Sequence, residues 1–151
     1  MTGARRNRPL RSLMISMGVG LLLISASPWA ACTLSTSGIA FGGYDPFVNQ
    51  NVDSAANISV MCDETTSYSI ALSTGNGTYE TRAMISGLHH LLYNLYVDAT
   101  LTTVWGDGTG QSATVSDTQS VGNYTVYGRI PAGQNAYVGV YSDTVVITVT
   151  F

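Results

Sequence analysis

The amino-acid sequence predicts an all-β protein with an immunoglobulin-like β-sandwich fold. The chain is rich in Thr, Ser, Val, Tyr and Gly, and no stretch repeats its apolar residues with the 3.6-residue period of an amphipathic helix. Short alternating segments are separated by turns that contain glycine or proline. About six or seven strands at this spacing, on a domain of roughly 120 residues, favour a sandwich over a closed barrel.

The strands are expected, in order, at residues 33–41, 58–62, 68–72, 91–97, 124–130 and 137–151, the last broken near Gly139 or Ser142. Turn sequences lie between them at residues 42–46, 75–77, 106–108 and 131–133. The final segment has the clearest period of two, because Val145, Ile147, Val149 and Phe151 share one face. A strand with one apolar face needs neighbours on that face and on both edges. The sequence stops inside this strand, just where another strand is expected, so we expect its missing neighbour to come from a different molecule.

Residues 1–31 have the features of a cleaved Sec signal peptide, and residues 32–151 are expected to form a single domain. Arginines precede an apolar stretch at residues 13–24, and small residues follow it. That stretch is too short to span a membrane, which takes about 20 apolar residues, so we expect export and no membrane span. Trp29, three positions before Cys32, argues against lipidation of that cysteine.

The charge of the mature domain excludes a nucleic-acid partner. Arg82 and Arg129 face nine acidic residues, which gives a net charge of about −7 once residues 1–31 are removed. Binding to phosphate backbones needs clustered Lys and Arg, and two isolated arginines do not provide it.

The two cysteines, Cys32 and Cys62, are expected to form a disulfide, because an exported protein folds in an oxidising compartment. Closing this loop stabilises the fold by roughly 3.5 kcal/mol in the chain-entropy model. The alternative is two unpaired buried thiols.

No catalytic, metal or cofactor site is expected, and the protein is predicted not to be an enzyme. His89 and His90 are adjacent, so on a strand they point to opposite faces and make a poor metal site. Acidic residues at turns are explained by turn chemistry; they are Asp45, Asp98, Asp107 and Asp143. Five aromatic residues are candidates for carbohydrate or surface binding, although half-buried structural roles are the commoner alternative; they are Tyr79, Trp105, Tyr127, Tyr137 and Tyr141.

Several sequence motifs resemble the spore coat protein U domain family, in the order in which that family has them. They are GIAFGGYDP at residues 38–46, YNLYVD at 93–98, VWGDGT at 104–109, YTVYGRIPAGQ at 124–134 and GVYSDTVVITVTF at 139–151. The similarity covers essentially the whole mature chain.

The resemblance implies a structural subunit of an archaic chaperone-usher pilus, a thin surface fibre that serves attachment and biofilm formation. Such subunits have an immunoglobulin-like fold without its final strand, and they are completed by donor-strand complementation, a form of β-augmentation. The expected partners are a periplasmic chaperone, an outer-membrane usher and neighbouring pilus subunits. The expected location is the periplasm during transit and then the cell surface or fimbrium.

The acceptor groove for the donor strand is expected along the first and last strands. Its predicted residues are Ile39, Phe41, Val145, Ile147, Val149 and Phe151. The alternative is that all six are ordinary core residues covered by the chain itself, because a period of two indicates burial without identifying what covers the face.

The sequence between the signal peptide and Cys32 is too short for a donor strand, which favours a subunit at the fibre tip. The alternative is a secreted coat or lectin-like sandwich that binds a surface or carbohydrate as a monomer.

Overall fold

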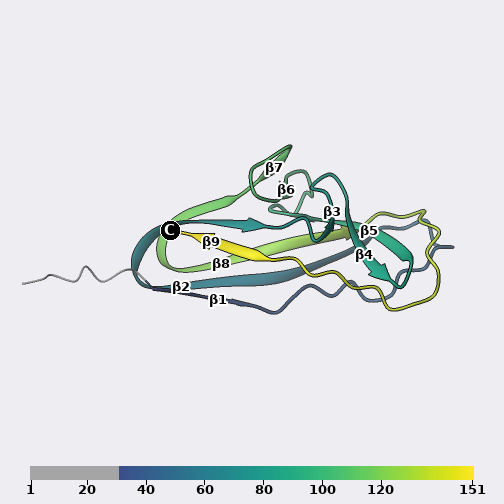
Figure 1. Ribbon diagram of the computed structural model, residues 1–151, viewed down its shortest axis with the longest axis horizontal. Coiled ribbons are helices and arrows are strands. Elements are labelled where there is room, and N and C mark those ends of the chain that lie inside the picture. The colour runs from purple at the N-terminus through teal and green to yellow at the C-terminus, as the bar shows by residue number, and fades with distance from the viewer. Residues whose placement is uncertain (1–30) are drawn as a thin grey trace, which may run out of the picture.

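The computed structural model describes residues 31–151, and these residues contain strands and connecting segments but no helix. The nine strands form one continuous curled sheet (Figure 1). Their bounds are β1 Cys32–Thr36, β2 Val52–Leu72, β3 Asn76–Gly77, β4 Arg82–Ser86, β5 His89–Tyr96, β6 Val104–Trp105, β7 Ser112–Ala113, β8 Val115–Ile130 and β9 Ile147–Thr150. The predicted all-β class and immunoglobulin-like sandwich are confirmed.

Two long strands, β2 and β8, contribute to both layers of the sandwich. They pair antiparallel from Val52 opposite Ile130 to Ile70 opposite Val115. The register shifts between Met61 and Thr66, and Figure 1 shows both ribbons curling over at this end of the molecule. An irregularity in the ladder bends a strand and increases its twist. The curl therefore lets one pair of strands form two facing walls.

The strands β1 and β9 pair with the same edge of β2, at different places along it. The path runs β1-β2-β8-β5-β4-β3, and β9 pairs with the last residues of β2. Most residues of β2 that pair with β1 or with β9 also pair with β8, as Ile58 and Ile70 do. Since a strand has two edges, β1 and β9 both lie on the edge opposite β8. Neither pairs with a further strand within residues 31–151.

The core lies between the two walls and consists mainly of alternate residues of β2, β5 and β8. Ile58, Val60 and Ile70 are at most 1% exposed. Trp105 from β6 is fully buried, and its indole N–H donates a 3.0 Å hydrogen bond to the carbonyl of Ile70. A buried indole needs such a partner, so this bond fixes β6 against β2.

The predicted disulfide is present. Cys32 and Cys62 are opposite each other in the β1–β2 ladder, and their sulfurs are 2.08 Å apart. The bond attaches β1 to β2 just before the bend in β2, so it fixes one border of the sheet.

Several strand predictions were wrong in extent. Residues 33–41 are a strand only to Thr36, because Gly38 and Gly42 have φ angles of 68° and 77°, which interrupt an extended chain. Residues 58–62 and 68–72 belong to the single strand β2. In the segment 137–151, only β9 and an isolated bridge between Ser142 and Ile85 are paired.

The strand β4 was not predicted; it begins at Arg82, which the structure buries completely. The predicted signal peptide lies outside the described residues except for Ala31. Within residues 31–151, no helix has the length and hydropathy needed to cross a membrane.

Candidate functional site

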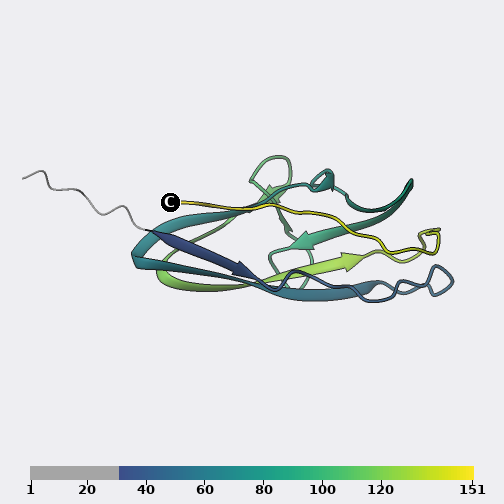
Figure 2. The same ribbon diagram turned by 60° about the horizontal axis from the view of Figure 1, so that its bottom comes forward.

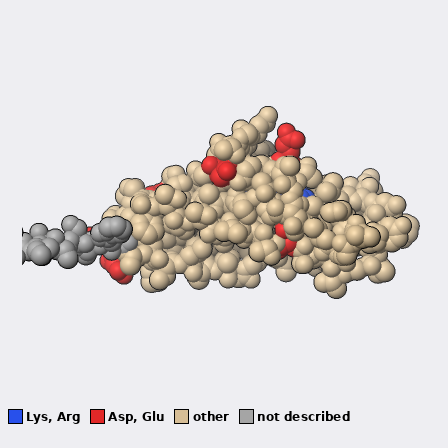
Figure 3. Space-filling view, viewed as in Figure 1, with Lys and Arg blue, Asp and Glu red and all other residues tan. Residues whose placement is uncertain are grey.

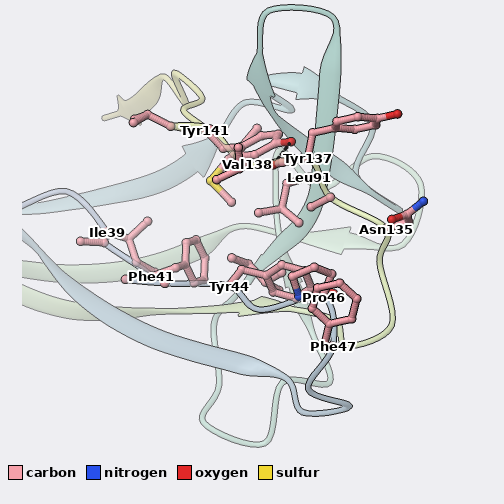
Figure 4. A pocket seen from close by; sticks show the side chains of 18 residues that line it. Ile39, Phe41, Tyr44, Pro46, Phe47, Leu91, Asn135, Tyr137, Val138 and Tyr141 are labelled. Carbon is pink, nitrogen blue, oxygen red and sulfur yellow. Dashed lines mark hydrogen bonds between the residues drawn. The ribbon is translucent and has the colours of Figure 1, made fainter.

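An apolar cleft separates the end of β1 and the residues that follow it from β9 and the residues that lead into it. We call these the first segment (residues 36–47) and the last segment (residues 135–151). The cleft contains a larger compartment of about 770 Å³ and a smaller compartment of about 330 Å³. Ile39 lines both, so they adjoin. Figure 4 shows Phe41 and Tyr44 on one side of the larger compartment, with Tyr141 and Leu91 across from them.

The six residues predicted to line a groove are divided between the cleft and its surroundings. Ile39 and Phe41 line the larger compartment, whereas Val145 and Ile147 line the smaller one. Val149 packs against the core but lines neither compartment. Phe151 is 62% exposed and borders a separate depression beside β2 and β8. The structure therefore brings the first four together, and their role in accepting a strand stays a prediction.

The side chains on the two sides of the cleft are less buried than the core behind them. Ile39, Phe41, Val145 and Ile147 are each half-buried, although they face inward. In the last segment, half-buried and exposed residues alternate from Tyr141 onward, as the period of two predicted. Side chains that face inward but remain half-buried pack against the core on one side and border unfilled space on the other.

The backbone on both sides of the cleft has unpaired hydrogen-bonding groups. Among the described residues, none of the N–H groups of residues 39–44 has a backbone partner. The outer edge of β9 also faces no strand there. Figure 2 shows the first segment (dark blue) and the last segment (yellow) passing on either side of the end of β8. Unpaired edges of this kind are templates for an added strand.

A contact between the first segment and β8 depends on Gly128. A Cβ atom at this position would lie 2.6 Å from both the Cδ1 atom of Ile39 and the ring of Phe41. Glycine therefore allows these two side chains to lie directly on β8. The Phe41 ring also meets the Tyr93 ring edge-on at 5.7 Å between centroids, which places it against β5.

Asp143 anchors the last segment to the sheet. Its Oδ1 accepts hydrogen bonds from the backbone and side-chain nitrogens of Asn76, at 3.0 and 2.8 Å. Its Oδ2 accepts a 2.6 Å bond from the Tyr93 hydroxyl. Burial, and secondly the bond to Asp143, raises the pKa of Tyr93 above its usual range, so the phenol remains a donor. The sequence-based explanation of Asp143 as turn chemistry was therefore incomplete.

A second anchor of the last segment begins at the buried residue Arg82. Its guanidinium donates to the carbonyls of Ser73 and Trp105 and to the side-chain oxygen of Asn94, at 2.6 to 3.1 Å. Burial lowers the pKa of Arg82, but these acceptors solvate the charge within the protein. Ser73 in turn exchanges hydrogen bonds with the backbone of Val146, both at 2.9 Å. Arg82 thus positions Ser73, and Ser73 in turn binds the last segment at Val146.

Exposed apolar side chains gather on the loops at one end of the molecule. Phe47 and Leu88 are 95% and 92% exposed, and Val138 and Val140 are also almost wholly exposed. These loops lie at the right-hand end in Figure 1. On the face shown in Figure 3, this end displays no acidic or basic side chain. An exposed apolar cluster of this kind is typical of an interaction surface.

The other candidate residues have structural explanations. Trp105 is buried, Tyr79 packs on Arg82 with the guanidinium 5.5 Å from its ring centre, and Tyr127 is half-buried on β8. Tyr137 and Tyr141 border the larger compartment.

The structure places His89 and His90, both exposed, on the first residues of β5. His89 stacks on Tyr137 with 4.1 Å between ring centres. Within residues 31–151, no group of three or more His, Cys, Asp or Glu side chains is placed to hold a metal ion.

Two residues of the far wall of the larger compartment, Met84 and Leu91, were not predicted as site residues. Met84 belongs to the unpredicted strand β4. Tyr44 was also missed; its hydroxyl accepts a 2.7 Å bond from the backbone N–H of Gln134, which joins the first segment to the residue just before the last segment. Its position in the GGYDP motif was the available signal.

Comparisons with known proteins agree with this architecture. Residues 19–148 match the family described as Spore Coat Protein U domain. "Protein U" of Myxococcus xanthus is 30% identical over 146 residues, which cover 83% of this chain and 80% of that relative.

A solved structure with 25% identity and a TM-score of 0.58 is the CsuC–CsuE chaperone–tip adhesion subunit pre-assembly complex from archaic chaperone-usher Csu pili of Acinetobacter baumannii. The match covers 82% of this chain but only 40% of that solved chain. With its family match spanning most of the sequence, the chain belongs to the spore coat protein U domain family.

Proposed function

We propose that this protein is an exported structural subunit of a chaperone-usher pilus whose sandwich is completed by a strand from another polypeptide. The observation that carries the proposal is the cleft between the first and last segments. It combines inward apolar side chains that are only half-buried with backbone edges that are unpaired on both sides within the described residues. An extended strand satisfies both needs, because its backbone pairs with the edges and its alternate side chains enter the cleft.

The partners in this proposal are a periplasmic chaperone, an outer-membrane usher and a neighbouring pilus subunit. Support comes from the similarity to a chaperone–subunit complex of archaic chaperone-usher pili. The chaperone lends a strand during transit through the periplasm, and a neighbouring subunit replaces it in the fibre. The role is structural rather than catalytic.

The free energy involved is large enough to make folding depend on the donor. A strand that buries four or five aliphatic side chains contributes roughly 6 to 15 kcal/mol. The whole stability of a typical domain is about 5 to 15 kcal/mol. A subunit without a donor strand is therefore expected to aggregate or to fold poorly.

We further propose that the subunit takes part in attachment and biofilm formation, at the fibre tip. Two observations favour this: the apolar loop residues Phe47, Leu88 and Val138 are exposed at one end of the molecule, and the similar solved chain belongs to a complex described as a chaperone–tip adhesion subunit complex. Replacing Leu88, the member of this cluster that does not line the cleft, by Ser is expected to reduce attachment of cells to surfaces while fibres still assemble.

A second candidate function is a secreted coat protein that acts as a monomer. The description of the family and the 30% identity to Protein U favour it. The two candidates differ in whether the folded protein needs a donor strand.

The test is expression of the protein with and without a candidate periplasmic chaperone, followed by measurement of soluble yield and complex formation. We expect soluble protein mainly as a stoichiometric complex with the chaperone. Equal recovery of a stable, folded monomer in both cases would contradict the pilus proposal and favour the secreted coat protein.

A further inference from the structure

The two compartments of the cleft differ in size and in the rigidity of their walls. The smaller one, of about 330 Å³, is backed by the core residues Ile58, Leu95 and Val126, which are 1 to 5% exposed. The larger one, of about 770 Å³, is bordered mostly by residues 39–47 and 135–141, which belong to no strand. Close-packed core walls resist expansion, whereas irregular segments can adjust to a large side chain.

A row of three residues marks the boundary between the compartments. Phe41 lines the larger compartment, whereas Tyr93 and Asp143 line the smaller one. The Phe41 and Tyr93 rings are in edge-on contact, and the Tyr93 hydroxyl bonds to Asp143. The row therefore connects the first segment to the last across β5. A strand that binds along the cleft crosses this row, so one of its side chains enters the larger compartment and another enters the smaller one.

The last segment indicates how far apart, along the incoming strand, the two side chains that enter the compartments lie. Tyr141 lines the larger compartment, and Val145, four residues later on the same inward face, lines the smaller one. Four residues of extended chain span about 13 Å. A strand lying alongside presents inward residues with the same spacing, so positions four apart enter different compartments.

We infer that the cleft selects its donor strand by side-chain size. The preferred strand has a large side chain, aromatic or Met, for the larger compartment and a small aliphatic side chain four residues away for the smaller one. This inference rests on the proposed function and specifies which strand the partner supplies. A large residue in the smaller compartment overpacks a rigid site, and a small residue in the larger one leaves a void.

The test uses the chaperone–subunit complex and synthetic strand peptides that differ only at the two positions. One peptide has Phe and Val, the second Phe and Phe, and the third Val and Val. A fourth peptide has Val and Phe in the reverse order, and it takes the place of the Phe/Val peptide in the ranking if the strand runs in the opposite direction. The measurement is the peptide concentration that displaces half of the chaperone. We expect the Phe/Val peptide to act at a concentration about tenfold lower than either the Phe/Phe or the Val/Val peptide.

Substitutions in the wall of the smaller compartment test whether this wall causes the selection by side-chain size. Leu95→Ala and Val126→Ala each enlarge the smaller compartment, so the Phe/Phe peptide should improve by about tenfold on these variants. Leu92→Ala, on the exposed face of the same strand as Leu95, is the matched control and should leave the ranking unchanged. If both wall variants fail to fold, the ranking of the peptides on the natural protein still decides the question.

Equal displacement by the Phe/Val and Phe/Phe peptides, or by the Phe/Val and Val/Val peptides, would overturn the size selection while leaving donor-strand completion intact. Failure of the proposed function has a different signature. In that case no chaperone complex forms, and no peptide binds to a monomer that is already complete.

Discussion

Tyr93 and Asp143 are joined by a 2.6 Å hydrogen bond that connects β5 to the last segment at the cleft. The Tyr93 side chain is almost fully buried, and the Asp143 carboxylate is half-buried. The bond thus holds one border of the cleft in place whether or not a strand occupies it. Fixing the border in advance lowers the entropy cost of accepting a partner.

Tyr93→Phe is expected to destabilise the protein by about 1 to 3 kcal/mol, because it removes the donor to a half-buried carboxylate. Tyr127→Phe is the control, since the Tyr127 hydroxyl has no hydrogen-bond partner among the described residues. Thermal unfolding of the two variants, each purified as its complex with the chaperone, provides the comparison. Equal losses for both would show that the bond to Asp143 contributes nothing.

The two arginines of the described residues, Arg82 and Arg129, are expected to respond very differently to substitution. Arg82→Met should cost about 3 kcal/mol or more, because it leaves the carbonyls of Ser73 and Trp105 buried without their donor. Arg129→Met should cost less than about 1 kcal/mol, since its ion pair with Asp53 is exposed. Soluble yield and unfolding temperature measure both effects. A mild effect of Arg82→Met would mean that its hydrogen bonds do not organise the sheet.

Ile147→Asp is expected to abolish fibre formation while leaving export intact. It places a carboxylate in the smaller compartment, where an unpaired charge is strongly unfavourable. Thr148→Asp is the matched control, because Thr148 is the next residue along β9 and points to solvent. Fibre length is measured by electron microscopy, and export by cell fractionation. Fibres of normal length from Ile147→Asp would contradict the assignment of Ile147 to the acceptor groove.

Asp98 is expected to make stability depend on pH in the acid range. It accepts a hydrogen bond from the Thr100 hydroxyl and a 2.8 Å bond from the backbone N–H of Thr103, and these bonds lower its pKa from the ordinary value of 3.8. The loop that they close holds Leu101 at a φ of 57°. A lowered pKa in the folded state stabilises the protein above pH 3.8, and this contribution is lost as the pH falls below that value.

Asp98→Asn should therefore lower the unfolding temperature near neutral pH and have progressively less effect below about pH 4. Thr100→Val removes the donor that contributes most to the pKa shift of Asp98. It should also lower the unfolding temperature near neutral pH, by less than Asp98→Asn does, and have progressively less effect at acid pH. Melting curves recorded between about pH 2 and 7 test this. A gap between the natural protein and Asp98→Asn that is constant over this range would show that the carboxylate does not contribute through ionisation.

The groove was predictable only in part. The alternation from Val145 to Val149 marked an inward face, and the structure places Val145 and Ile147 at the cleft. Phe151 follows the same alternation, yet it borders a different depression, because β9 runs away from the cleft along β2, from Ile147 opposite Leu72 to Thr150 opposite Ser69. Periodicity identifies a face, whereas the position of a residue along a cleft depends on strands that are distant in sequence.

The sequence by itself determined the all-β class, the Cys32–Cys62 disulfide and the inward face of the last strand, because residue composition, redox compartment and a period of two are local properties. Only the tertiary structure decided that β2 and β8 curl to form both walls, that Arg82 is buried, and that Gly128 admits Phe41 onto β8. These features depend on contacts between residues far apart in the chain. A local pattern shows that a side chain turns inward, but packing decides what it meets there.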